Sequence, residues 1–400
     1  MDSEQQMHHS KKIQFSKSTL IFVLAIIVFA TTLRTPLTVV GPIISFIREG
    51  LGISNVLAGF LTTIPLLGFA VISPFAPRIA RKFGMEMTLF YSVIILSIGI
   101  LLRSSGMTAL LLMGTVLIGI AIAFGNVLIP SYFKLRYPLH IGLLTGIYTV
   151  SMNTSAGLAA GISHPIASSG WGWQGALGFS IILSVATLVM WIPLIRGKKV
   201  EMATISGNQP KKQLWKSPLA WAIAGSMGLQ SLIFYCSSAW LPEIFIAQGM
   251  SAHSAGWMGS IMQMSQIPMT FLIPIIAGKL PTQRPIVVFF TICYLIGFTG
   301  VLMEWTSLAV LWMMFLGFAG GASFGLIMMF FTLRTKTAYE AAELSGFAQS
   351  VGYLLAAAGP VLFGYLHDAT NSWFLPISVF VIVSLLLFIM SFFSAKNSFV

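Results

Sequence analysis

The sequence predicts an all-α integral membrane protein, whose twelve transmembrane helices form two pseudo-symmetric halves of six. Three observations lead to this prediction: the composition, the length of the apolar runs and the placement of the charges. Of the 400 residues, 56% are hydrophobic and only 8% are charged, whereas soluble domains carry about 25% charged residues. A composition this poor in charge indicates a chain that lies largely in lipid.

Apolar runs recur along the whole chain at the length a helix needs to cross roughly 30 Å of hydrocarbon, about 20 residues. A membrane β-barrel would instead have short segments of alternating polarity. We therefore predict twelve helical spans, at 19–45, 54–77, 86–103, 108–132, 141–166, 173–195, 218–241, 252–277, 286–303, 308–331, 342–366 and 373–394.

The lysines and arginines are distributed very unevenly between the two sides of these spans. Of the 22, only Arg48 and Arg103 fall on one side and Arg34 falls inside the first run, which leaves 19 for the other side. This is the positive-inside pattern, and it predicts cytoplasmic N- and C-termini. It also accounts for the net charge of +12 without nucleic acid as a partner.

The linker between the sixth and seventh runs divides the chain into two similar halves. Leu144-Thr-Gly146 opens the fifth run and Leu344-Ser-Gly346 opens the eleventh, while Leu135-Arg136 and Leu333-Arg334 end the fourth and tenth. Such matches at a nearly constant offset indicate an internal duplication. The predicted organisation is a cytoplasmic tail at 1–17, an N-terminal six-helix half at 18–195, a cytoplasmic linker at 196–217 and a C-terminal six-helix half at 218–400.

Four stretches of the chain form recognisable motifs: Arg34-Thr-Pro-Leu-Thr-Val-Val-Gly-Pro42, Ala58-Gly-Phe-Leu-Thr-Thr-Ile-Pro-Leu-Leu67, Gly125-Asn-Val-Leu-Ile-Pro130 and Ala348-Gln-Ser-Val-Gly-Tyr-Leu-Leu-Ala356. They resemble the cyanate permease / 2-nitroimidazole transporter family of the major facilitator superfamily. Arg81-Lys-Phe-Gly-Met-Glu86 is most similar to the 2-nitroimidazole exporters of this family. The resemblance implies a 6+6 major facilitator fold in a bacterial inner (cytoplasmic) membrane. It implies transport of a small molecule by alternating access, with the site between the halves.

The loop after the second run departs from the usual superfamily pattern. Arg81 stands where an acidic residue belongs, so any gating ion pair there must be built differently, with Glu86 as one candidate. We expect gating contacts from Arg81, Glu86, Arg136 and Arg334.

Arg34 lies near the middle of the first run, 17 residues after Lys17 and 14 before Arg48. A mid-bilayer arginine costs at least about 2.5–3.5 kcal/mol, and no acidic residue lies at mid-depth in any run. A water-filled cavity that holds an anionic or electron-rich substrate explains it best. A structural arginine satisfied by backbone carbonyls is the alternative, and Pro36 and Pro42 are predicted helix-breaking residues that would free such carbonyls.

Neutral polar residues at mid-depth in other runs form a candidate site around this cation. As a set they suit a small polar anion or a nitro-heteroaromatic ring. The predicted substrate-binding residues are Arg34, Thr38, Thr63, Asn126, Tyr148, Asn153, Tyr235, Gln263, Gln266, Gln349 and Tyr353.

The sequence leaves three functions open. The first, which we expect, is export of 2-nitroimidazole-like compounds. An inside-negative membrane drives anions outward, and no buried carboxylate is available to couple import to protons. The second is a proton-coupled importer of cyanate or another small anion. The third is a membrane-embedded enzyme, which lacks support because no histidine lies at mid-depth beside Gly178-Phe-Ser180 or Gly321-Ala-Ser323 to act as a base.

Beyond the bilayer and a small-molecule substrate we expect no partner, and the protein is predicted to be a monomer. No cofactor, catalytic residue or metal site is predicted. The cysteines, Cys236 and Cys293, have neither disulfide nor metal-site spacing.

Overall fold

The computed structural model describes residues 17–196 and 213–400, which form helices and loops without a strand. The predicted tail and linker lie almost wholly outside these residues. The first half contains α1 (Lys17–Thr38), α2 (Ile44–Leu51), α3 (Asn55–Ile72), α4 (Ala76–Phe83), α5 (Met85–Arg103), α6 (Thr108–Arg136), α7 (Ile141–Ala167), α8 (Gly172–Gly178) and α9 (Ile181–Arg196). The second contains α10 (Pro218–Ala247), α11 (Ala252–Ala277), α12 (Arg284–Leu302), α13 (Ala309–Leu333), α14 (Ala338–Thr370) and α15 (Phe374–Ser394).

These helices make up the twelve predicted spans. Within the described ranges, ten helical segments are long and apolar enough to cross a membrane, and α3 with α4, which meet at a 60° bend, make an eleventh. The twelfth is α7, whose 27 residues are long enough but include many Gly, Ser and Thr. It packs against α1 on one side and α11 on the other, so it needs less apolar surface than a lipid-facing helix.

The first span is interrupted where the prolines predicted a break. α1 ends at Thr38, two residues after Pro36, and a 3₁₀ turn at Gly41–Ile43 contains Pro42 before α2 begins. Pro fixes its own φ and cannot donate a backbone hydrogen bond, so the helix cannot continue unchanged through both positions.

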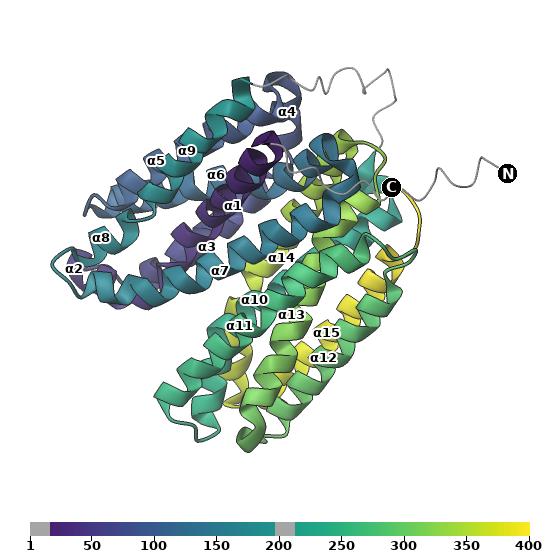
Figure 1. Ribbon diagram of the computed structural model, residues 1–400. Coiled ribbons are helices and arrows are strands. Elements are labelled where there is room, and N and C mark those ends of the chain that lie inside the picture. Colours follow the sequence, from purple (N-terminus) through teal and green to yellow (C-terminus); the bar gives the residue numbers. More distant parts are fainter. Residues whose placement is uncertain (1–16, 197–212) are drawn as a thin grey trace.

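The two groups of helices meet at one end of the molecule and point apart at the other (Figure 1). The meeting end carries residue 400 together with Arg81, Lys134 and Arg334, and we call it the basic end. Between the halves, α7 packs on α11 and α3 packs on α14. The other end, where α2 and α8 lie far from the turn between α10 and α11, is called the opposite end (Figure 1).

Glycines allow the halves to approach closely at the basic end. A Cβ added at Gly142 or Gly146 of α7 would lie 2.6 Å from the Pro274 carbonyl or 2.7 Å from the Phe271 carbonyl of α11. A Cβ at Gly346 of α14 would lie 2.5 Å from the carbonyl of Ser73. Any side chain there would force the backbones apart, so these contacts depend on glycine.

Toward the opposite end the same helix pair is not in contact. A Cβ at Gly157 or Gly161 of α7, or at Gly256 or Gly259 of α11, would meet no atom within 4 Å. The structure is therefore closed between the halves at the basic end and separated along α7 and α11 at the opposite end.

Candidate substrate-binding site

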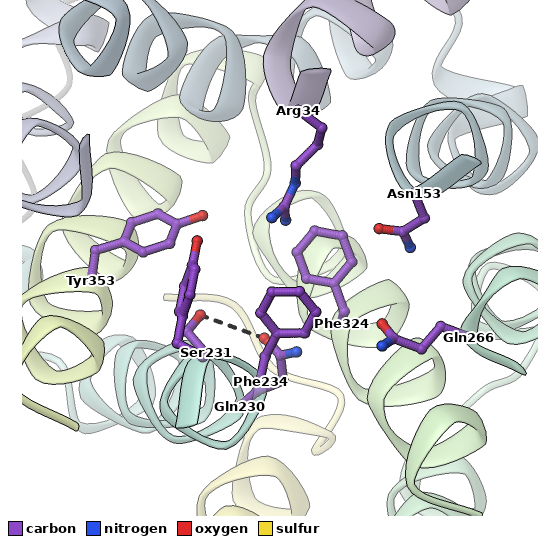
Figure 2. A pocket seen from close by; sticks show the side chains of 9 residues that line it. Arg34, Asn153, Gln230, Ser231, Phe234, Gln266, Phe324 and Tyr353 are labelled. Atoms are coloured by element: carbon purple, nitrogen blue, oxygen red, sulfur yellow. Dashed lines mark hydrogen bonds between the residues drawn. The ribbon is translucent and has the colours of Figure 1, made fainter. Parts of the chain in front are cut away.

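Arg34 faces a small cavity between the two halves, which we call the central cavity. Two of its lining residues come from the N-terminal half and seven from the C-terminal half. Figure 2 shows Arg34 and Asn153 extending toward side chains of the other half. The lining residues are Arg34 and Asn153, on α1 and α7, with Gln230, Ser231, Phe234, Tyr235, Gln266, Phe324 and Tyr353 on α10, α11, α13 and α14.

The Arg34 guanidinium is surrounded by aromatic rings. Its Cζ lies 5.8 Å from the centroid of Phe234 and 5.7 Å from that of Phe324, and the Tyr235 side chain is within hydrogen-bonding reach. Ring faces attract a cation only weakly compared with a carboxylate. No ion pair to Arg34 forms within residues 17–196 and 213–400, so its positive charge is available to a ligand.

Two amide side chains add hydrogen-bonding groups to the cavity wall. The Nδ2 atom of Asn153 is buried and has no hydrogen-bond partner, which is unusual for a polar atom in a folded protein. Gln266 donates from Nε2 to Gln263 Oε1 at 2.8 Å. A ligand with acceptor atoms would pair with Asn153 and Arg34 together.

Residues 20–360 match the Major Facilitator Superfamily. The chain belongs to the major facilitator superfamily. It is 44% identical to the uncharacterized transporter YycB of Bacillus subtilis (92% of this chain and 91% of the relative) and 38% identical to the 2-nitroimidazole transporter of Escherichia coli (93% and 94%). It is 24% identical to the E. coli cyanate transport protein CynX (88% and 91%).

These relatives confirm the cyanate permease / 2-nitroimidazole transporter family that the motifs predicted, and the protein is a multi-pass membrane transporter. The proton:xylose symporter XylE, bound to 6-bromo-6-deoxy-D-glucose, has the same fold. Its structure superposes with a TM-score of 0.78 over 94% of this chain and 95% of that one, at 14% identity.

Five of the eleven predicted binding residues line the transporter's central cavity: Arg34, Asn153, Tyr235, Gln266 and Tyr353. Gln263 lies behind Gln266, to which it is hydrogen-bonded. Thr38 does not line the cavity. Its hydroxyl donates a hydrogen bond to the Arg34 carbonyl at 3.2 Å. Thr63 is half-buried on α3 and outside the lining.

Asn126, Tyr148 and Gln349, also predicted binding residues, do not line the cavity but bond to one another. Gln349 Nε2 donates to the Asn126 carbonyl at 3.0 Å, and the Tyr148 hydroxyl lies 3.4 Å from Asn126 Oδ1. Gln349 Oε1 is buried without a partner. The first of these contacts links α14 to α6 and so helps to hold the two halves together.

Four residues line the cavity but are absent from the predicted set: Gln230, Ser231, Phe234 and Phe324. Phenylalanines are ordinary in an apolar helix, so nothing in the sequence distinguishes a cavity-facing ring from a lipid-facing one. Gln230 is at the same depth, where its Oε1 lies 3.5 Å from the Ser231 hydroxyl (Figure 2).

Among the predicted gating residues, Arg81 is the one that reaches the other half. It donates a hydrogen bond to the Tyr339 hydroxyl, its Cζ lies 4.1 Å above that ring, and Nη2 is 3.7 Å from Glu343 Oε1. Glu86 is not its partner: Glu86 accepts a 2.7 Å hydrogen bond from Arg136. The ion pair of Glu86 therefore stays within the N-terminal half.

Lys134, which is not among the predicted gating residues, makes a second contact between the two halves. Its Nζ donates to the carbonyls of Thr332 (2.7 Å) and Thr335 and lies 3.1 Å from the Thr335 hydroxyl. Because Lys134 belongs to α6 and its acceptors to the end of α13, this bond helps to close the basic end.

Arg334 braces the C-terminal half internally. It is 2% exposed and donates to Gln283 Oε1 and to the carbonyls of Ser394 (2.8 Å) and Ala395 (3.0 Å). Burial lowers the pKa of Arg334 to about 10, so the guanidinium is still charged at neutral pH. These partners all belong to its own half.

Arg103 was assigned to the connection on the opposite side, but the structure buries it. It is 1% exposed, and its Nη1 donates to the carbonyl of Pro36 at 2.7 Å. Nε and Nη2 have no partner. A second arginine, Arg103, is thus hydrogen-bonded to the last turn of α1, close to Arg34.

Proposed function

We propose that this protein exports a small polar anion or nitro-heteroaromatic compound across the bacterial inner membrane, with the basic end toward the cytoplasm. The observation that carries the proposal is the Arg34 guanidinium, which faces the central cavity without an ion-pair partner in the described part of the chain. A half-buried cation at this depth of the membrane is costly, and such residues mark substrate or ion pathways. The names of two relatives, a 2-nitroimidazole transporter and a cyanate transport protein, support the same substrate classes.

Alternating access follows from the contacts between the halves. Arg81 and Lys134 close the basic end, while α7 and α11 separate beyond Asn153. We infer that the substrate is released at the opposite end from this state. Closing the opposite end and opening the basic end would complete the cycle.

A proton-coupled importer of cyanate or another small anion is the alternative. Coupling through the site would require a titratable group beside Arg34, and among the described lining residues there is no carboxylate or histidine. This favours uncoupled export.

Substrate counterflow in proteoliposomes tests the proposal with cyanate, nitrate, formate and 2-nitroimidazole. Arg34→Gln keeps a polar side chain but removes the charge, and we expect it to reduce transport of accepted anions at least about a hundredfold, the cost of roughly 3 kcal/mol. Arg34→Lys should retain part of the activity because the charge remains while the planar donor pattern is lost. Normal transport of every accepted anion by Arg34→Gln would refute a central anion site.

A further inference from the structure

The face that α7 turns toward α11 changes along its length from closed to open. At Thr149 the contact is direct, because its hydroxyl donates to the Thr270 carbonyl of α11 at 2.7 Å. One turn further along α7, Asn153 lines the central cavity, and so does Gln266, which lies one turn from Thr270 on α11. Beyond these two amides the helices separate. Asn153 and Gln266 are therefore the first facing pair after the last closed contact.

The two amides extend into the cavity from opposite halves (Figure 2). Asn153 Nδ2 is buried and has no hydrogen-bond partner. Gln266 Nε2 donates one hydrogen to Gln263 Oε1 at 2.8 Å and keeps a second, since a primary amide carries two. Both helices thus present an amide N–H to a ligand that Arg34 attracts. An anion with two or more acceptor atoms has enough of them to pair with both amides.

Glycines leave room for the two helices to close beyond this pair. Gly157 lies one turn past Asn153, and Gly259 lies two turns from Gln266 on the same face of α11. A Cβ at either glycine would meet no atom within 4 Å. At the basic end, Gly146 already packs against a backbone carbonyl of α11. The same kind of packing is therefore available at the opposite end once α7 and α11 are drawn together.

We propose that Asn153 couples substrate binding to closure of the opposite end. An anion held by Arg34 accepts from the Asn153 amide on α7 and from the Gln266 amide on α11, and it so replaces the contact that the helices lack at this level. These bonds draw α7 toward α11, and the glycines beyond can then meet. Asn153 is a positioning residue, because its loss impairs closure even where Arg34 still binds the anion. The inference rests on the proposed function, since it assigns the step that follows anion binding to Arg34.

Spin labels at the two helix ends measure this closure directly. Gly170, just after α7, and His253, in the first turn of α11, are both exposed, and cysteines there can be labelled in a background without Cys236 and Cys293. We expect saturating formate to shorten the distance between the labels, measured by double electron–electron resonance. In Asn153→Ala the distance should keep its formate-free value, although formate still raises the melting temperature and therefore still binds.

Counterflow kinetics test the same step through transport. Asn153→Ala removes a buried donor that has no partner, so it should fold like the wild type. It should lower kcat for formate at least about tenfold and raise KM by less than about threefold, because Arg34 supplies most of the attraction while closure limits turnover. Asn153→Gln keeps an amide and should restore part of kcat. Thr154→Ala, on an exposed neighbour, is the matched control and should change neither parameter.

The kinetics and the label distances can each overturn the coupling. A raised KM with unchanged kcat in Asn153→Ala would make Asn153 an ordinary binding contact. Label distances that shorten with formate in Asn153→Ala as in the parent protein, or that stay constant in both while formate is transported, would also refute it. Failure of the proposed function looks different, because formate transport would then survive Arg34→Gln. Transport that is lost in Arg34→Gln, together with normal closure in Asn153→Ala, would overturn only the coupling.

Discussion

The guanidinium of Arg103 donates a 2.7 Å hydrogen bond to the carbonyl of Pro36, two residues beyond Arg34. The bond reaches from α5 to the last turn of α1, just before that helix ends at Thr38. A buried cation with one acceptor contributes little net stability, because desolvation offsets the attraction. We therefore interpret Arg103 as a positioning residue, which fixes the backbone that directs Arg34 into the central cavity.

The variant Arg103→Met tests whether Arg103 positions the backbone next to Arg34 or mainly stabilises the fold. The change removes a buried charge but leaves the Pro36 carbonyl without this donor, at a cost of about 1–3 kcal/mol, so the two effects oppose each other. We expect a melting temperature in detergent within a few degrees of wild type and a KM raised about tenfold, equivalent to about 1.4 kcal/mol. Arg103→Lys should restore part of the KM. A large fall in melting temperature with unchanged KM would indicate a purely structural arginine.

Removing the contacts of Arg81 should loosen the basic end. Tyr339→Phe keeps the ring under the guanidinium and removes the hydroxyl, and Glu343→Gln removes the charge at 3.7 Å. Partly exposed pairs of this kind contribute about 1 kcal/mol or less. Each variant should therefore shift the equilibrium by up to about fivefold toward the state in which the basic end is open. The double variant should shift it by more.

Cysteine labelling measures this shift. Ser73 is fully buried, and its carbonyl lies against Gly346 at the closed basic end. In a background without Cys236 and Cys293, Ser73→Cys should react faster with a maleimide when Tyr339 and Glu343 are changed. Labelling at the unaltered rate in the double variant would mean that Arg81 does not hold this end closed.

Gly157 of α7 tests closure at the opposite end. It lies eleven residues beyond Gly146, which returns it to almost the same helix face, and it has open space around it in this state. Gly157→Leu should fold and bind substrate normally but lose more than about 90% of its flux, because the leucine blocks the approach of α11. Leu158→Ala, on a 64% exposed neighbour, is the control. Wild-type flux in Gly157→Leu would exclude contact at this position.

The sequence predicted the helical spans well because apolar length and charge placement are both dictated by the bilayer. It also located the interruption of the first span, since α1 passes through Pro36 but ends at Thr38, and Pro42 lies in the 3₁₀ turn that follows. What it could not predict was the direction in which each polar side chain points. Gln349 looks like Gln266 in sequence, but Gln349 donates across the interface to the Asn126 carbonyl and Gln266 lines the cavity. The side chain of Asn126 lies against Tyr148, whereas that of Asn153 lines the cavity.

Helix rotation explains the remaining differences. The rotation of each span is set by packing against several neighbours, and such contacts leave no local pattern in a helix that is apolar all round. Phe234 and Phe324 were overlooked for this reason. The burial of Arg103 could not be predicted either, because a charge at the end of a span is usually solvated, whereas its acceptor is a carbonyl 67 residues away in the chain.

The described residues that line the central cavity include no carboxylate, and this leads to a prediction about the driving force. If the anion crosses alone, each transport event moves one charge, and a potential of 100 mV contributes about 2.3 kcal/mol. That is enough for a concentration ratio of about fiftyfold at equilibrium. Proteoliposomes with a potential set by valinomycin and potassium should therefore accumulate the anion on the positive side, to the same extent at pH 6 and pH 8. Proteoliposomes that contain the Arg34→Gln variant serve as the control for passive leakage of the anion. Acidification or alkalinisation of the lumen in proportion to flux would instead establish proton coupling and favour the importer.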